Sequence, residues 1–107
     1  MKKGMIKVSV IYPNGDGKEF DMEYYLNSHV PLVAETLGDA LKGASYDKGV
    51  AGGEPGSEPP YLAMANLFFE TMGDFGEAFA TGAPILMGDL PNFTNIEPVI
   101  QINEVAA

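Results

Sequence analysis

Two kinds of hydrophobic spacing alternate along the chain and predict its secondary structure. In residues 5–12, MIKVSVIY, apolar side chains fill every second position, which is typical of a strand with one buried face. The turn-forming residues of PNGDG, 13–17, end this strand. Helical spacing follows, in the stripe Met22, Leu26, Val33 and Leu37. With Asp21 as N-cap, Phe20 packing on Tyr25 as a staple and Gly38 as a stop, it predicts a helix over 21–37.

The second half of the chain repeats this alternation. A strand is expected near 43–51, and GGEPGSEPP at 52–60 is expected to form a mobile loop. YLAMANLFFE at 61–70 is apolar on both faces, as a central strand covered on both sides would be. Thr71 then caps a helix that Gly82 is expected to end, and Pro84 opens a further turn. The last strand is expected at 97–105.

The predicted order of elements is β-α-β-β-α-β, which indicates an α+β ferredoxin-like domain over residues 1–107. In this arrangement two helices cover one face of a four-stranded antiparallel sheet. Strand 61–70, however, has two apolar faces. Leu62, Met64 and Phe68 form one of them, and the other consists of Ala63, Ala65, Leu67 and Phe69. We expect this second set to be the outer face, and an uncovered apolar face predicts a homodimer that pairs sheet against sheet.

The helix at 21–37 contains the chain's single histidine, His29, two residues before Pro31. On a straight helix His29 lies near the centre of the apolar stripe, one turn after Tyr25, and therefore faces the sheet. Pro31 lacks the N–H that would bond the carbonyl of Asn27, so the helix must kink, or break and restart at Ser28. Freed polar backbone beside a buried imidazole predicts the lining of a cavity. The alternative is a core histidine that is satisfied by internal hydrogen bonds.

Asn66 is the polar position of strand 61–70, on the face shared by Leu62, Met64 and Phe68. If that face meets the helix, Asn66 and Met64 lie opposite His29. Apolar walls with a few placed donors and acceptors are the usual design of a small-molecule pocket. A bulge, or a simple hydrogen bond between Asn66 and His29, explains the same pattern.

Composition narrows the partners. A formal net charge of −9 disfavours nucleic acid, anionic membranes and large anionic substrates. There is no cysteine, and no apolar run approaches the roughly 20 residues of a membrane span. One histidine without a carboxylate one or two turns away on its face argues against a metal site, and no glycine fingerprint for flavin or nicotinamide occurs. We therefore expect no cofactor and a neutral small-molecule ligand, in a cytoplasmic protein.

Two segments carry a family resemblance that spans essentially the whole chain. Tyr24-Tyr25, followed by His29-Val30-Pro31-Leu32, resembles the YW…H.PL pattern of the EthD-like family, and residues 89–94, DLPNFT, resemble its late D…NFT segment. The resemblance implies ferredoxin-like subunits whose sheets pair into a dimeric α+β barrel. Relatives with this barrel include cofactor-free monooxygenases, muconolactone isomerases and EthD-like dehydratases, and some bind haem through a histidine. The resemblance also carries over the histidine and the aromatic pair, with Tyr25 where the family often has tryptophan.

Two classes of function remain open. In a cofactor-independent enzyme, His29 would act as general base or acid on a small apolar, aromatic or ketonic molecule. Tyr25 or Asn66 would orient the substrate or stabilise a developing oxyanion, with Tyr24, Met64 and Phe93 also near the ligand. In a non-catalytic binding or accessory protein of a degradation pathway, the same pocket would only hold the ligand. Spacing alone places no second titratable group to orient His29.

Overall fold

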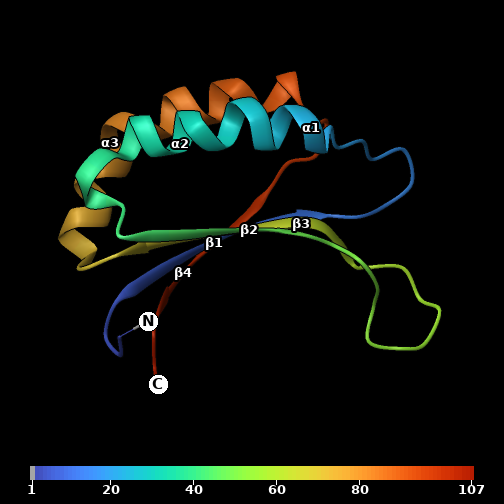
Figure 1. The fold of residues 1–107 in the computed structure, drawn as a ribbon, viewed down its shortest axis with the longest axis horizontal. Coiled ribbons are helices and arrows are strands. Elements are labelled where there is room, and N and C mark those ends of the chain that lie inside the picture. The colour runs from blue at the N-terminus through green and yellow to red at the C-terminus, as the bar shows by residue number, and fades with distance from the viewer. Residues whose placement is uncertain (1) are drawn as a thin grey trace.

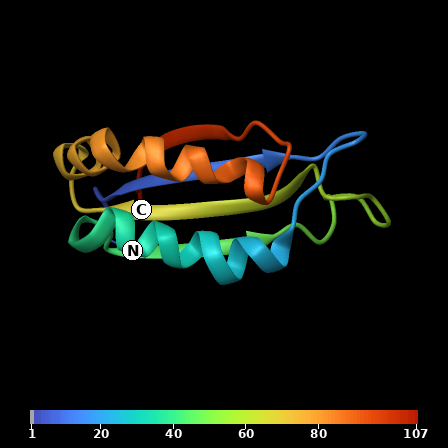
Figure 2. The same ribbon diagram turned by 90° about the horizontal axis from the view of Figure 1, so that it is seen from above.

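The computed structural model describes residues 2–107, and these form one antiparallel sheet beneath two helices (Figure 1). The strands are β1 (Ile6–Pro13), β2 (Gly43–Lys48), β3 (Tyr61–Phe69) and β4 (Val99–Glu104), arranged in the order β2-β3-β1-β4. Both helical segments lie on the same side of the sheet, and seen from above they run side by side across it (Figure 2). This is the predicted ferredoxin-like α+β architecture.

The first helical segment continues without interruption through the proline. Asp21 caps α1 (Met22–Tyr24) by accepting a hydrogen bond from the Tyr24 N–H, and a π-helical turn, Tyr25–His29, leads into α2 (Val30–Leu37). Of the two expected alternatives, a kink or a break with restart at Ser28, the break does not occur, because helical backbone continues from Met22 to Leu37. Because Pro31 cannot donate, the turn before it widens, and the Val30 N–H donates to the carbonyl of Tyr25.

The wide turn also shifts the faces of the helix. Tyr25 and His29 are both buried, while Leu26, which belonged to the predicted apolar stripe, is 47% exposed. The extra residue in the π turn rotates the later positions about the helix axis relative to those before the turn. Val33 and Leu37, which follow the turn, are buried in the core. The Phe20–Tyr25 staple is confirmed, with ring centroids 4.9 Å apart. Gly38 ends α2 with a positive φ of 57°, as its stop signal predicts.

The second helix, α3 (Met72–Asp89), is capped by Thr71, whose side chain accepts from the Asp74 N–H. The prediction that Gly82 ends this helix is wrong, because α3 continues through both Gly82 and Pro84. Gly82 is buried where α3 crosses α2. A Cβ atom there would lie 3.1 Å from Cγ2 of Thr36 and 3.2 Å from Cδ2 of Leu37. The glycine therefore allows close helix packing, and a short 3-10 turn, Leu90–Asn92, follows the helix.

The core lies between the helices and the inner face of the sheet. Its largest cluster comprises Ile6, Val8, Val33, Leu37, Leu67, Phe69, Phe75 and Leu86. The two faces of β3 are the reverse of those expected, since Ala63, Ala65, Leu67 and Phe69 face the helices. Leu67, paired with Val8 of β1, is 3% exposed, so this set cannot be an outer interface. Alternation alone does not tell which of two apolar faces the helices will cover.

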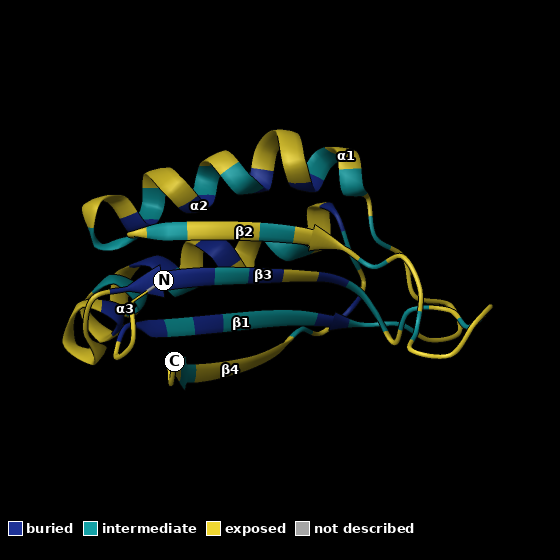
Figure 3. Cartoon of the chain, turned by 60° about the horizontal axis from the view of Figure 1, so that its bottom comes forward, coloured by how far each residue is buried: buried dark blue, intermediate teal, exposed yellow. Residues whose placement is uncertain are grey.

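The outer face of the central strands carries polar side chains as well as apolar ones. Asn66 accepts a hydrogen bond from Ser9 at 3.2 Å and donates to Ser45 and to Asp47, each also at 3.2 Å. Met64 shares this face and is 37% exposed. Figure 3 shows largely exposed edge strands, β2 and β4, around the more buried β1 and β3. The outer face is thus only partly apolar.

Segment 52–60 projects beyond the end of the sheet (Figure 1). Its base is held by hydrogen bonds from the Gly49 N–H to Leu62 and from the Asn14 N–H to Pro60, and the Gly52 N–H bonds Ser57 across the loop. The mobility of this loop stays a prediction. Within residues 2–107, no helix is both long and apolar enough to cross a membrane.

Candidate functional site

His29 closes the π turn and points between the two helices, with only 7% of its side chain exposed. Its Nδ1 lies 2.8 Å from Oδ2 of Asp89, the last residue of α3. The carboxylate side chain is itself 12% exposed. The ionisable ring and the acid thus form a largely buried pair at the junction of the two helical segments.

Three groups hold the Asp89 carboxylate. Besides the contact with His29, it accepts hydrogen bonds at Oδ1 from the Tyr24 hydroxyl at 2.8 Å and from the Asn92 side chain at 2.9 Å. Burial by itself raises the pKa of Asp89, but the bonds from Asn92, His29 and Tyr24 outweigh it, so the pKa lies below its ordinary value. Hydrogen bonding to Asp89 in turn raises the pKa of the Tyr24 hydroxyl. Asp89 is therefore ionised at neutral pH.

An ionised carboxylate only accepts hydrogen bonds, so Nδ1 of His29 must be the donor. In the neutral ring this leaves the lone pair on Nε2, and the hydrogen bond of His29 found within residues 2–107 is the one through Nδ1. A histidine held in this tautomer presents a basic nitrogen on the side of the ring away from the acid. The arrangement is suited to accepting a proton.

Backbone contacts fix the segment that follows α3 against the start of α1. The Asp21 N–H donates to the carbonyl of Phe93 at 2.7 Å, and the Thr94 hydroxyl donates to the carbonyl of Glu19 at 2.6 Å. An isolated antiparallel bridge also joins Phe20 to Thr94. These bonds bring the two segments of the family resemblance together, and with them His29 and Asp89.

Sequence reasoning missed Asp89 as the partner of the histidine. It placed the end of the helix at Gly82, which left Asp89 in irregular chain with no predicted position relative to His29. Asp89 nevertheless opens the late DLPNFT segment, and an acid in a segment that shares a pattern with the histidine was the available signal.

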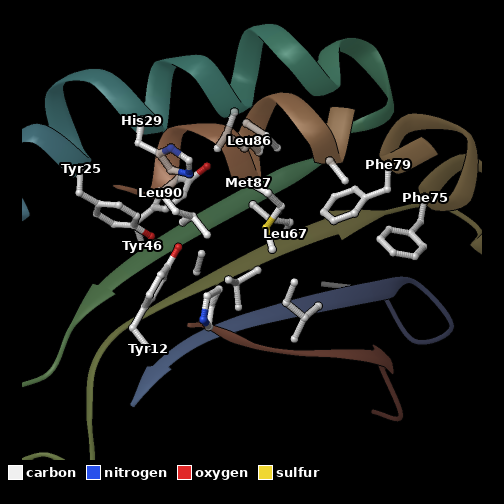
Figure 4. Close-up of a pocket in the computed structure, with 16 residues that line it drawn as sticks. Tyr12, Tyr25, His29, Tyr46, Leu67, Phe75, Phe79, Leu86, Met87 and Leu90 are labelled. Atoms are coloured by element: carbon white, nitrogen blue, oxygen red, sulfur yellow. The ribbon is translucent and has the colours of Figure 1, made fainter. Parts of the chain in front are cut away.

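A cavity of about 170 Å³ lies between the helices and the inner face of the sheet (Figure 4). Tyr12, Tyr25, His29 and Tyr46 gather at one end, and Phe75 and Phe79 lie toward the other. The remaining walls are apolar, and they comprise Val10, Val33, Ala65, Leu67, Ala83, Leu86, Met87, Leu90, Pro98 and Ile100. The cavity thus combines one imidazole and three phenols with a hydrocarbon wall.

Tyr25 stacks on His29 with ring centroids 5.7 Å apart, and both line the cavity. Phe93 packs against the His29 ring at 4.7 Å but lies outside the cavity lining, and Tyr24 stacks on Phe93 at 6.1 Å. Phe93 and Tyr24 therefore pack against the imidazole and its acid without lining the cavity. Of the predicted site residues, the structure therefore brings four together around one centre: Tyr24, Tyr25, His29 and Phe93.

Asn66 and Met64 are not part of this group. Their side chains lie on the outer face of the sheet, whereas the cavity is lined by their neighbours Ala65 and Leu67. The expected opposition of Asn66 and His29 is wrong, because the polar partners of Asn66 are Ser9, Ser45 and Asp47. The inverted faces of β3 account for this difference.

The site offers little to a metal or a large cofactor. Among residues 2–107, no group of three or more His, Cys, Asp or Glu side chains could hold a metal ion. The cavity is also smaller than the roughly 300–1,000 Å³ of pockets that enclose drug-sized ligands, so its volume does not fit a haem. Its size suits a molecule of about one ring, since a 150 Å³ apolar cavity is known to bind benzene.

Three comparisons place the chain among known proteins. The family model of the EthD domain matches residues 15–97. A crystal structure of an EthD-like protein from Ralstonia eutropha JMP134 has a TM-score of 0.91 and 38% identity, covering 99% of this chain and 96% of that one. An uncharacterized 11.0 kDa protein from the thcB-thcC intergenic region of Rhodococcus erythropolis is 33% identical over 78 residues, which is 72% of this chain and 71% of the relative.

A more distant structure bears on the fold alone. The crystal structure of a dimeric protein of unknown function with a ferredoxin-like fold, from Bacteroides fragilis NCTC 9343, is 13% identical with a TM-score of 0.56. The match covers 97% of this chain and 99% of that one. The predicted ferredoxin-like fold is thereby confirmed.

Proposed function

The chain belongs to the EthD domain family, and from this premise we propose that it is a cofactor-independent enzyme of small-molecule degradation. The substrate is a small apolar, aromatic or ketonic molecule bound in the cavity between helices and sheet. His29 moves a proton to or from it, in a reaction of monooxygenase, isomerase or dehydratase type. In the first case molecular oxygen is the co-substrate.

The observation that carries this proposal is the 2.8 Å contact between Nδ1 of His29 and Asp89. A general base must be held in one orientation and one tautomer, and a carboxylate on the far nitrogen supplies both. Asp89 also stabilises the imidazolium that forms when Nε2 takes a proton. The hydrogen bonds from Tyr24 and Asn92 keep the carboxylate itself in place.

The surroundings of the pair support the same function. Apolar walls lower the local dielectric constant and so strengthen the electrostatic interactions between the groups that line the cavity. Tyr25, stacked on His29 and lining the same cavity, is placed to orient a substrate oxygen or to stabilise negative charge on it.

The alternative is a non-catalytic binding or accessory protein. The observation that favours it is the apolar character of the cavity, whose lining holds no other ionisable side chain than His29 and the three tyrosines. Such a cavity would hold a small ligand whether or not His29 acts on it.

We propose in addition that the protein is a homodimer that pairs through the outer face of the sheet. The distant structure with the same fold is described as dimeric. On this chain, the outer face combines Met64, which is 37% exposed, with the polar row around Asn66. In a dimer, these side chains would meet their copies across a two-fold axis.

Turnover by the purified protein tests the catalytic proposal. Small molecules that copurify with the wild type are identified by mass spectrometry, and their conversion is followed together with oxygen uptake. The variant His29→Gln should lose turnover, while Ser28→Ala, an exposed neighbour, should retain it. Equal turnover by His29→Gln would remove the histidine from the mechanism. Binding without conversion by the wild type would establish the accessory protein instead.

A further inference from the structure

The hydroxyl of Tyr25 is buried without a hydrogen-bond partner among residues 2–107. The residue is 1% exposed, and its side chain lines the cavity beside His29 (Figure 4). Buried phenols almost always find a partner, because an unsatisfied donor is costly to keep in the folded state. An orphaned hydroxyl at the wall of a cavity therefore marks the place where a bound molecule supplies the missing acceptor.

Two further phenols define the character of this end of the cavity. The rings of Tyr12 and Tyr46 pack edge-on against Tyr25, with centroids 6.0 and 5.9 Å away. Burial raises the pKa of all three hydroxyls, and the electrostatic interaction with Tyr12, Tyr46 and Asp47 raises that of Tyr25 further. These phenols stay protonated over the whole physiological range, so Tyr25 always offers a hydrogen to an acceptor.

Charge excludes an anionic ligand. None of the 16 lining residues is a lysine or arginine, and the one histidine among them already faces the carboxylate of Asp89. Asp47 adds a second negative charge that acts on Tyr25. A carboxylate or phosphate in this cavity would lose its hydration without meeting an unpaired positive side chain. The atom that accepts a hydrogen bond from the Tyr25 hydroxyl is therefore an uncharged oxygen.

Volume sets the size of the molecule that bears this oxygen. A cavity of about 170 Å³ is slightly larger than the 150 Å³ apolar cavity that holds benzene. The aromatic and aliphatic walls around Phe75, Phe79 and Leu67 leave a hydrocarbon surface for a single ring. The ring would lie on these walls with its oxygen at the tyrosine end.

We propose that the cavity selects uncharged single-ring aromatic molecules bearing a carbonyl or hydroxyl oxygen, and that this oxygen accepts a hydrogen bond from the Tyr25 hydroxyl. The inference rests on the proposed function for the use of the cavity as a substrate site. Tyr12 and Tyr46 shape the oxygen end, and His29 lines the same cavity one turn from Tyr25. An aryl ketone meets these requirements, while its hydrocarbon isostere and the corresponding carboxylate each lack one of them.

Three probes of similar shape test this proposal: acetophenone, isopropylbenzene and benzoate. Their dissociation constants are measured by NMR titration against the wild type, Tyr25→Phe and the control Tyr61→Phe, whose ring lies outside the cavity. The wild type should bind acetophenone about tenfold more tightly than isopropylbenzene, the worth of one hydrogen bond, and should bind benzoate more weakly than either. Tyr25→Phe should remove the preference for the ketone, and Tyr61→Phe should keep it.

Tyr25→Phe deletes an unsatisfied hydroxyl and no packing contact, so its melting temperature should equal or exceed that of the wild type. An unchanged ratio of ketone to hydrocarbon affinity in Tyr25→Phe would overturn the assignment, as would benzoate binding as tight as that of acetophenone. His29→Gln separates this proposal from the catalytic one, because it should lose turnover and keep the preference for acetophenone over isopropylbenzene. If the wild type shows this preference but no turnover, the result supports oxygen recognition by Tyr25 and contradicts the proposal that the protein is an enzyme.

Discussion

His29 and Asp89 are separated by 60 residues in the sequence and by 2.8 Å in the folded chain. The π turn before Pro31 directs the imidazole inward, and the continuous helix α3 delivers the acid to it. Neither element alone would bring the ring and the acid together.

Asp89→Asn should lower turnover by roughly 10²–10⁴-fold, the usual contribution of a general base, while the fold persists. The amide can no longer hold His29 in the tautomer that exposes the Nε2 lone pair. Steady-state rates, with circular dichroism to check folding, make the comparison. Asp39→Asn is the matched control, since Asp39 is exposed and remote from the cavity. Undiminished turnover in Asp89→Asn would show that the carboxylate does not orient the base.

The stability that Asp89 contributes should disappear in acid. Its pKa is lower in the folded protein than in the unfolded chain, so the contribution is complete above the unfolded value of about 4. It is lost as the pH falls through the folded-state pKa. The difference in melting temperature between wild type and Asp89→Asn should therefore be large at neutral pH and shrink toward pH 3. A difference that is independent of pH would contradict the ionised carboxylate.

Substituting alanine at each of two glycines of α3 should change the stability of the protein in opposite directions. Gly76 has open space around a Cβ atom, so Gly76→Ala should stabilise the protein by up to about 1 kcal/mol through helix propensity. At Gly82 the same methyl group would press on Thr36 and Leu37, and Gly82→Ala should destabilise by about 1–2 kcal/mol. Chemical denaturation measures both. Equal stabilisation by the two substitutions would mean that the helices are not in tight contact at Gly82.

A lysine on either face of β3 distinguishes the core from the proposed dimer interface. Leu67→Lys should unfold the protein, because Leu67 is 3% exposed beneath the helices. Met64→Lys, three positions earlier on the outer face, should leave the fold intact and split the dimer. Light scattering and circular dichroism follow the two effects. A monomeric wild type at micromolar concentration would remove the proposed interface altogether.

The sequence predicts the fold well and the site in part. Alternation at 5–12 and the caps Asp21 and Thr71 depend on local rules, and the structure follows them. Gly82 fails as a stop signal because tertiary packing between α2 and α3 outweighs local preference. Asn66 is misplaced for a different reason. A strand with two apolar faces leaves undetermined which one the helices cover, and pairing with β1 decides it.

The most direct test of the oriented His29–Asp89 pair is to determine which ring nitrogen of His29 carries the proton. The imidazole nitrogens give an unobscured NMR signal, because the chain has a single histidine. At a pH where the ring is neutral, the wild type should carry its proton on Nδ1, bonded to Asp89, and leave Nε2 unprotonated and responsive to added acetophenone. Asp89→Asn should lose this fixed tautomer. A wild-type ring with its proton on Nε2, unaffected by Asp89→Asn and by the ketone, would contradict the oriented base at the cavity wall.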